Sequence, residues 1–253
     1  MSNSKISIRN YSLRYSDGVQ ALKNINLEIH ANAINVLFGP SGGGKSSLLR
    51  SINRLIDMAD PDELNGEILF NGKNILGEDT NVAALRRKIG MVFSRPIPLP
   101  KSIFENVAFG LRVAGENDPA VLQSKVEEAL KQAYLWDEVY DRLNDPGISI
   151  SGGQQQRLCL ARVLALEPEV IMLDEPTSAL DPVTTARIES FLQEIKERIT
   201  VIIAPHNMSQ SARVSDYSSF FLQGELIESG EGSLLFFNPK DQRTQDYVEG
   251  RFG

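Results

Sequence analysis

Near the start of the chain lies a glycine-rich loop whose residue types suit phosphate binding. Gly39-Pro-Ser-Gly-Gly-Gly-Lys45-Ser46 fits the pattern G-x-x-x-x-G-K-[ST] in full. Glycines let several backbone N–H groups converge on one phosphate, and a following helix adds its positive N-terminal end. In this pattern Lys45 reaches the β- and γ-phosphates and the Ser46 hydroxyl binds Mg²⁺. The candidate nucleotide-binding residues are Gly39, Pro40, Ser41, Gly42, Gly43, Gly44, Lys45, Ser46 and Ser47.

Two acids follow a short apolar run farther along the chain. Val170 to Leu173 predicts a buried strand, and Asp174 and Glu175 come directly after it. Such a strand projects its last residues at the carboxyl edge of the sheet, where the phosphate loop also lies. Asp174 is then placed to hold Mg²⁺ and Glu175 to polarise an attacking water. The alternative is a pair of helix-capping acids, since Pro176 follows.

A histidine occupies a comparable position after another predicted strand. Val201 to Ala204 is apolar, and His206 follows it. At the same sheet edge, the His206 ring could donate a hydrogen bond to the γ-phosphate. His30 has no such context and is assigned no role.

A second glycine-rich loop, Ser151-Gly-Gly-Gln154, opens a predicted helix; we call it the serine loop. Serine can cap that helix, and the glycines expose N–H groups to an anion. One phosphate loop already serves one nucleotide, so a second anion site is best used on a nucleotide held by another copy. Two copies related by a two-fold axis would then enclose two nucleotides. The alternative is an ordinary capped helix.

The remaining pattern supplies the elements that position these residues. The predicted strands and antiparallel region are 5–30, Ile34 to Phe38, Glu67 to Phe70, Val170 to Leu173 and Val201 to Ala204; the predicted helices are 46–56, 120–135 and the one that begins at Asp181-Pro182. Alternating prolines at 96, 98 and 100 favour an extended segment. Strand–helix alternation around the phosphate loop predicts a mostly parallel sheet covered by helices, with a mostly helical insert over about 95–165.

Composition and charge argue against several classes of protein. The 253 residues suffice for one large domain, or for a core with a smaller insert. A net charge of −7 without a Lys/Arg run argues against a nucleic-acid partner. A single cysteine, Cys159, cannot form an internal disulfide and favours a reducing compartment. No apolar run is long enough to span a bilayer, and the first residues lack the apolar stretch of a signal peptide.

Together these motifs resemble the ATPase subunit of ABC transporters, in order and spacing over nearly the whole chain. The resemblance rests on Gly39 to Ser46, Ile150-Ser-Gly-Gly-Gln154, Asp174-Glu175, Ser178-Ala-Leu-Asp181 and His206. Within that family the chain looks most like the ATPase of bacterial phosphate importers. The stretches that carry this are Ala21 to Leu27, Leu85 to Phe93, Gly152 to Cys159, His206 to Met208, Arg213 to Asp216 and the ending Asp246 to Gly253.

The resemblance implies an α/β, P-loop ABC ATPase fold: a mostly parallel core sheet, an antiparallel β subdomain and a helical subdomain. Residues 1–94 and 166–253 would form the core with the β subdomain, and 95–165 the helical subdomain with the serine loop. It implies a homodimer docked on two transmembrane permease subunits, peripheral to the cytoplasmic face of the membrane. A periplasmic or extracellular phosphate-binding protein would act on the outer side.

For single residues the resemblance implies more specific roles. Glu175 would be the general base, His206 the sensor of the γ-phosphate, and Lys45 a catalytic phosphate ligand. Ser151 and Gly153 would contact nucleotide, and Asp181 would lie at the contact across the dimer. The cofactors implied are ATP and Mg²⁺. The segment after Phe93 would lie where the permease's cytoplasmic helices dock, unless it is simply a stiff linker.

The chain departs from the family pattern at three positions. Ser94 stands where the family has a glutamine that reaches Mg²⁺ and the attacking water; serine can still ligate Mg²⁺ but is two atoms shorter. Pro205 replaces a small hydroxyl residue before His206, removing a backbone donor. The aromatic expected to stack on adenine falls by spacing on Ser16, with Tyr15 one position away, so Tyr15 is the candidate.

The leading hypothesis is an ATP-hydrolysing subunit for the uptake of inorganic phosphate. One alternative keeps the ATPase and changes the cargo to another oxyanion or nutrient, because nothing in this subunit touches the cargo. Another is a nucleotide-binding regulatory subunit with little turnover. Ser94 and Pro205 keep this alternative open, whereas the intact Lys45, Asp174 and Glu175 argue against it. A DNA-repair or translation ABC protein is disfavoured, because those usually need large inserts or tandem cassettes.

Overall fold

The computed structural model describes residues 4–178, 180–205 and 207–251. Its strands are β1 Ser4–Tyr15, β2 Gln20–His30, β3 Ile34–Phe38, β4 Pro61–Phe70, β5 Lys73–Asn74, β6 Ile89–Val92, β7 Val170–Asp174, β8 Thr200–Ala204, β9 Tyr217–Leu222 and β10 Glu225–Glu231. Its helices are α1 Lys45–Ile52, the 3₁₀ helix η1 Leu55–Ala59, α2 Val82–Lys88, α3 Ile103–Val113, α4 Pro119–Gln132, α5 Trp136–Val139, α6 Gly152–Leu164, α7 Pro182–Ile195, α8 Met208–Val214, α9 Gly232–Phe237 and α10 Gln242–Val248.

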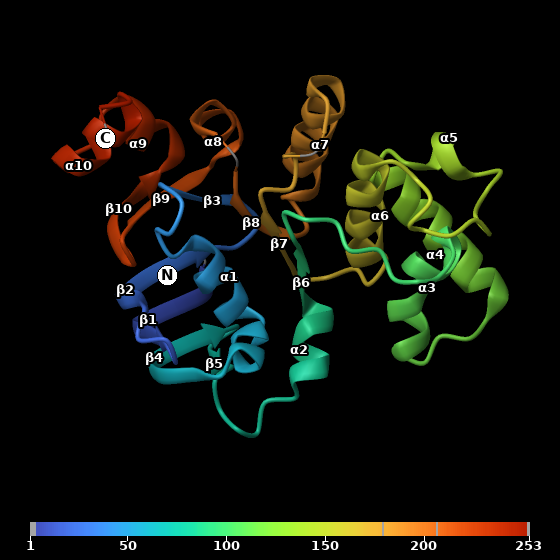
Figure 1. Cartoon of the computed structure of the whole chain (residues 1–253), viewed down its shortest axis with the longest axis horizontal. Coiled ribbons are helices and arrows are strands. Elements are labelled where there is room, and N and C mark those ends of the chain that lie inside the picture. Colours follow the sequence, from blue (N-terminus) through green and yellow to red (C-terminus); the bar gives the residue numbers. More distant parts are fainter. Residues whose placement is uncertain (1–3, 179, 206, 252–253) are drawn as a thin grey trace.

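Two sheets organise the chain. The core sheet has the strand order β10-β9-β3-β8-β7-β6, and its inner pairs are parallel, with β10 antiparallel to β9. The second sheet, β2-β1-β4-β5, is antiparallel throughout. Figure 1 shows this second sheet on one side of the molecule and α3 to α6 gathered on the other. The predicted α/β fold, with a mostly parallel core sheet and an antiparallel β part, is confirmed.

The core sheet lies between two hydrophobic cores because its buried strands alternate. In β7, Val170 and Met172 face the core shared with the antiparallel sheet and α1. Ile171 and Leu173 face the other core, shared with α3, α4, α6 and α7. Every residue of β7 is buried, which is why its sequence is apolar up to the final Asp174. The sheet therefore holds the phosphate-loop elements on one face and the helical part on the other.

Between β6 and β7 the regular elements are the helices α3 to α6. Local capping explains where two of them begin. The Ser102 hydroxyl accepts a hydrogen bond from Glu105 N, and Asp118 caps α4 with proline at the first helical position. The assignment of 95–165 to a separate subdomain stays a prediction. No helix within the described ranges is both long and apolar enough to cross a membrane.

The helix predicted over 46–56 ends earlier, at Ile52, and a 3₁₀ turn follows. Arg54 adopts a left-handed backbone conformation with φ 62°, which an α-helix cannot include. Its guanidinium donates to the Ile75 carbonyl at 2.8 Å and pairs with Asp57. Tertiary contacts of this arginine therefore outweigh the helical period of the sequence. Strand β4 also begins at Pro61, six positions before the predicted Glu67.

The Glu169 carboxylate connects the two sheets. Glu169, just before β7, accepts hydrogen bonds from Lys5 Nζ of β1 at 2.7 Å and from Asn71 Nδ2 at 3.0 Å. Lys88, at the end of α2, lies 3.0 Å from its other oxygen. Burial alone would raise the pKa of Glu169, but the hydrogen bonds from Lys5, Asn71 and Lys88 outweigh it and hold the pKa at about 2.

Replacing Glu169 with glutamine should lower the free energy of unfolding by about 1 kcal/mol at neutral pH, the upper end for partly exposed ion pairs. Because the folded pKa lies below the ordinary 4.5, the stabilisation is present above that value and is lost as the pH falls toward about 2. Urea unfolding of both forms across this range should show the difference shrinking. A difference as large at the acid end, or an equal loss in the exposed control Glu67→Gln, would contradict the assignment.

Candidate nucleotide-binding site

The phosphate loop follows β3 and leads into α1, as predicted. Gly39 has φ 137°, and a Cβ there would collide with the Phe221 carbonyl oxygen of β9. Gly44, the N-cap of α1, has φ 104°, and its Cβ would lie 2.8 Å from the Ala21 carbonyl oxygen of β2. Neither position can accept a side chain without a shift of its neighbours. The loop is thus held between β9 and β2 in a shape that only glycine permits.

This loop lines a cavity of about 330 Å³, which we call the loop cavity. It gathers predicted site residues from three separate parts of the chain. The lining residues are Tyr15, Val19, Gln20, Ala21, Ser41, Gly42, Gly43, Gly44, Lys45, Ser46, Ser47 and Glu175. Gly39 and Pro40 form the base of the loop and bind Lys45 through their carbonyl oxygens.

Lys45 is held inside the loop. Its Nζ donates to the Gly39 carbonyl at 2.7 Å and to the Pro40 carbonyl at 2.9 Å. Burial lowers the pKa of Lys45, while the nearby Glu175 and Asp174 act to raise it. The ammonium is therefore already placed at the loop, where phosphate oxygens could replace the two carbonyls as acceptors.

Asp174 at the end of β7 is buried, with 7% of its surface exposed. Burial raises its pKa, and a hydrogen bond from the Ser46 hydroxyl acts to lower it. A carboxylate beside a hydroxyl is an oxygen donor pair that suits Mg²⁺, which commonly takes one or two carboxylates and completes its shell with phosphate and water. Within the described ranges no cluster of three His, Cys, Asp or Glu side chains could hold a metal without such help. These residues fit Mg²⁺ that arrives with a nucleotide.

Glu175 turns the chain away from β7 at the loop cavity. Its φ is 46°, a left-handed conformation uncommon outside glycine, and its N–H donates to the Ala204 carbonyl of β8 at 2.8 Å. Glu175 lines the loop cavity together with the loop glycines. Strained backbone that persists at a cavity points to a functional role.

The other predicted residues near this edge differ in what the structure says of them. The Tyr15 hydroxyl lies 3.0 Å from Ser47 Oγ, on the cavity wall. Ser94 is exposed, and it is not among the described residues that line the loop cavity. His206 lies outside the described residues, and Pro205 before it is buried. The roles of Tyr15, Ser94 and His206 stay predictions.

The serine loop lies apart from the loop cavity of its own chain. The Ser151 hydroxyl accepts from Gln154 N at 3.3 Å, and Gln154 Oε1 accepts from Ser151 N at 2.9 Å, forming a capping box. Ser151 is exposed, and in Figure 1 α6 lies across β6 and β7 from α1. Neither Ser151 nor Gly153 is among the described residues lining the cavity. The geometry leaves this loop available to another molecule.

Asp181 is likewise exposed, at the N-cap of α7. Its Oδ1 accepts from Val183 N at 2.9 Å and Thr184 N at 3.0 Å. A hydrogen bond from the Thr184 hydroxyl is the largest cause of its lowered pKa. The predicted helix start is therefore present, and the contact across a dimer stays a prediction.

Sequence reasoning missed the polar contacts that support the serine loop. Arg157 Nη1 and Nη2 lie 2.7 and 3.0 Å from the Glu138 carboxylate, which also accepts from Gln154 Nε2 at 2.8 Å. On the same helix, Gln156 Nε2 donates to the Phe93 carbonyl at 2.9 Å. No sequence pattern predicts hydrogen-bonded pairs that are so far apart along the chain. The buried Gln156 and Arg157 were the available signal, since polar side chains on a buried helix face need partners.

A glycine loop between a buried parallel strand and a helix, with its lysine in place and an acid pair at a neighbouring strand end, defines the P-loop nucleoside-triphosphatase class. The comparisons with known proteins narrow this class. The family model described as ABC transporter matches residues 22–178. The chain therefore belongs to the ABC transporter family.

Individual relatives agree with the family. The phosphate import ATP-binding protein PstB 2 of Bacillus subtilis (strain 168) is 50% identical over 251 residues, covering 99% of this chain and 93% of that protein. Among solved structures, a bacterial Atm1-family ABC exporter with ATP bound has TM-score 0.81 and 26% identity; it covers 98% of this chain, which spans 42% of the exporter. The dimeric post-hydrolysis cassette MJ0796 bound to ADP and Pi has TM-score 0.80 and 30% identity, covering 89% of this chain and 98% of the cassette.

Replacing Glu138 with glutamine should lower the free energy of unfolding by about 1–3 kcal/mol, because it leaves the guanidinium of Arg157 without its carboxylate. Chemical unfolding measures this loss. The matched control is Asp137→Asn, a change of the same kind at an exposed neighbour. Equal stability of the Glu138 variant and the control would show that the carboxylate does not support the serine loop.

Proposed function

We propose that this chain is the ATP-hydrolysing subunit of an ABC importer and couples ATP binding and hydrolysis to the uptake of inorganic phosphate. The observation that carries the ATPase is the convergence of Lys45, Ser46, Asp174 and Glu175 at one sheet edge. The cargo is supported by the 50% identity with a phosphate import protein over nearly the full length of both chains.

The chain's own groups suggest how the reaction is carried out. Backbone N–H groups of the phosphate loop and the Lys45 ammonium bind the β- and γ-phosphates and stabilise their negative charge. The Ser46 hydroxyl and the Asp174 carboxylate would hold Mg²⁺, and Tyr15 would pack on the adenine. Mg²⁺, when bound, supplies Lewis-acid polarisation of the phosphate oxygens. The Glu175 carboxylate orients the attacking water and accepts its proton.

The active form we propose is a homodimer. Ser151 and Gly153 of one copy would close over the nucleotide held in the loop cavity of the other, and Asp181 would lie at the contact between them. Three observations support this: Ser151, Gly152 and Asp181 are exposed, the serine loop does not line its own loop cavity, and a related cassette is dimeric. A two-fold arrangement satisfies both sites at once.

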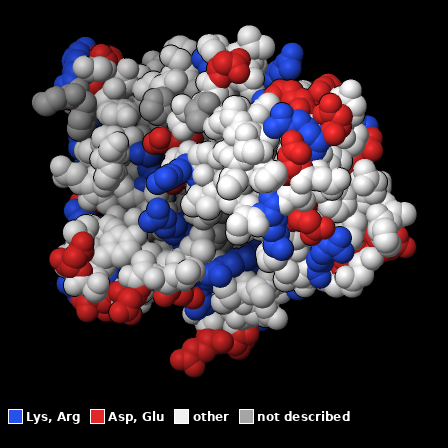
Figure 2. Space-filling model, turned by 45° about the vertical axis from the view of Figure 1, so that its right-hand side comes forward, with Lys and Arg blue, Asp and Glu red and all other residues white. Residues whose placement is uncertain are grey.

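In the same proposal the dimer docks on two permease subunits at the cytoplasmic face of the membrane, with a phosphate-binding protein on the outer side. The docking region would include residues 94–101 and α3, which expose apolar side chains at Ile97, Phe109 and Val113. Figure 2 shows Lys and Arg side chains gathered along a hollow in the middle of one face. The exposed side chains of Ile97, Phe109 and Val113 favour docking segments that carry apolar residues.

The first experiment measures ATP hydrolysis by the purified chain with Mg²⁺, beside Glu175→Gln and with size-exclusion chromatography in ATP. Glutamine cannot accept a proton, so turnover should fall by roughly 10²–10⁴-fold while ATP binding persists and the dimer accumulates. Uptake of labelled phosphate by the chain reconstituted with its permease then tests the cargo. Turnover in Glu175→Gln equal to that of the unmodified chain would contradict the assigned base.

Ser94 favours the second candidate function, a regulatory subunit with little turnover. Ser94→Gln should raise turnover or ATP affinity, because its amide extends two atoms farther toward the metal and water. The same change at the exposed Ser190 of α7 is the matched control. If Ser94→Gln leaves both quantities at the level of the control, the serine is not what limits this site.

A further inference from the structure

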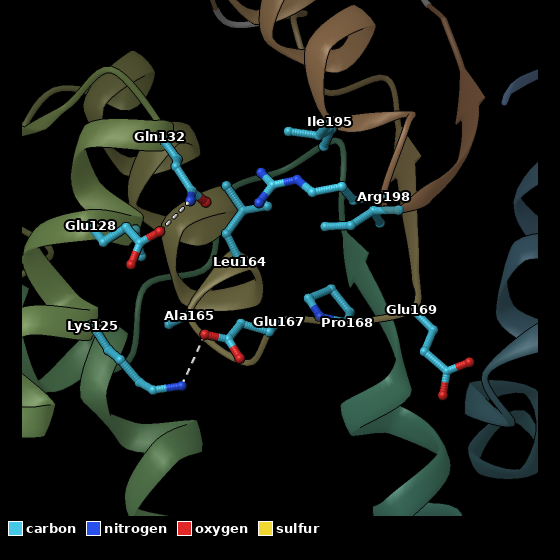
Figure 3. A pocket seen from close by; sticks show the side chains of 12 residues that line it. Lys125, Glu128, Gln132, Leu164, Ala165, Glu167, Pro168, Glu169, Ile195 and Arg198 are labelled. Atoms are coloured by element: carbon cyan, nitrogen blue, oxygen red, sulfur yellow. Dashed lines mark hydrogen bonds and ion pairs between the residues drawn. The ribbon is translucent and has the colours of Figure 1, made fainter. Parts of the chain in front are cut away.

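A second cavity of about 360 Å³ lies at the opposite edge of the core sheet from the phosphate loop (Figure 3). We call it the seam cavity, because its walls come from α4 and α6 on one side and from the end of α7 on the other. Its lining residues are Lys125, Glu128, Ala129, Gln132, Leu164, Ala165, Glu167, Pro168, Glu169, Ile195, Arg198 and Ile199. Glu169 directly precedes β7 and Ile199 directly precedes β8, so the cavity is at the amino ends of these strands. It shares no lining residue with the loop cavity.

The floor of the seam cavity is apolar and firmly placed. Ala129 and Ile195 are each 2% exposed and Leu164 4%, because the rest of each side chain is packed in the hydrophobic core. Pro168, two residues before β7, also lines the cavity and is buried. Such a floor favours an apolar body of a ligand.

The charged residues on the rim divide into satisfied and available groups. Lys125 pairs with Glu167 at 3.0 Å, and Glu169 is held by Lys5 and Lys88. Two charges remain. The Arg198 side chain has no hydrogen bond or ion pair to any described residue, and Glu128 accepts one hydrogen bond, at 3.1 Å, from the neutral amide of Gln132.

Figure 3 shows the Arg198 guanidinium extending from the end of α7 across the cavity toward α4, the helix that carries Gln132 and Glu128. A cation and a carboxylate therefore face the same apolar floor from opposite walls. An occupant that complements both must carry an anion, a cation and an apolar body. Inorganic phosphate carries neither the cation nor the apolar body, so it would satisfy Arg198 and leave Glu128 without a partner charge.

We propose that the seam cavity binds a small zwitterion with an apolar side chain, of the chemical class of free α-amino acids. The ligand's carboxylate pairs with the Arg198 guanidinium, which suits it in bidentate geometry. Its ammonium pairs with Glu128. Its side chain covers Leu164, Pro168 and Ile195. The volume falls within the usual range for small-molecule sites, about 300–1,000 Å³.

This site is far from the serine loop, although the same helix reaches both. α6 has 13 residues and so is about 20 Å long, with Ser151 at its start and Leu164 at its end. A ligand in the seam cavity touches α4 and α6 on one wall and α7 on the other. It therefore favours the present arrangement of the helical part on the core, separately from any nucleotide contact.

Calorimetric titration of the purified chain with L-leucine and L-phenylalanine tests the proposal. We expect saturable binding of at least one of them. The N-acetyl derivative of the amino acid that binds lacks the ammonium, and its amide derivative lacks the carboxylate. Each derivative should bind at least tenfold more weakly than the free amino acid. Inorganic phosphate should not compete.

Arg198→Gln and Glu128→Gln should each weaken binding at least tenfold. Both side chains are exposed, so these variants should keep their thermal stability. Arg87→Gln on α2 and Glu194→Gln on α7 change the same residue types at exposed positions outside the cavity and should bind as the unmodified chain does. The proposal is overturned if neither amino acid binds, if both derivatives bind as tightly as the free amino acid, or if the cavity variants bind as the control variants do.

Discussion

The structure depends on a steric constraint: the phosphate loop has to pass between two backbone carbonyls with no room for a Cβ atom. Phe221 of β9 closes on Gly39, and Ala21 of β2 closes on Gly44. This packing joins the parallel sheet and the antiparallel sheet at the loop, since one carbonyl belongs to each. The loop's shape is thus fixed by its neighbours before any phosphate is present, which lowers the cost of ordering it upon binding.

Electrostatics at this edge follow from the same burial. Removing water disfavours both charged forms, so the pKa of Lys45 falls and that of Asp174 rises. The loop carbonyls at Gly39 and Pro40 and the Ser46 hydroxyl compensate in part. Phosphate oxygens beside Lys45 and a metal beside Asp174 would compensate more completely. Lys45 and Asp174 are thus only partly compensated without a ligand, and this favours binding of a negatively charged ligand that carries a metal ion.

The sequence predicted what is local and missed what is distant. β3, β7 and β8 were found within a residue because buried parallel strands are continuous apolar runs, and the phosphate loop because its spacing is fixed by backbone geometry. β6 was missed, since Gly90 interrupts the apolar side chains of Ile89–Val92. The Glu169–Lys5 contact joins residues 164 apart, and the seam cavity exists only once α4 and α7 are packed. Such features depend on tertiary structure rather than on period or motif.

The helical part is joined to the nucleotide edge through polar contacts of α6 as well as through the core. Gln156 Nε2 donates to the Phe93 carbonyl, and Arg162 Nη1 donates to the Ile97 carbonyl at 3.1 Å. Both carbonyls belong to the segment around Ser94, which is stiffened by its prolines. Gln156 is buried, so water cannot replace its hydrogen bond to the Phe93 carbonyl if that bond breaks. Losing this contact is therefore costly. These two hydrogen bonds therefore attach the segment to α6, the helix that Ser151 caps at its other end.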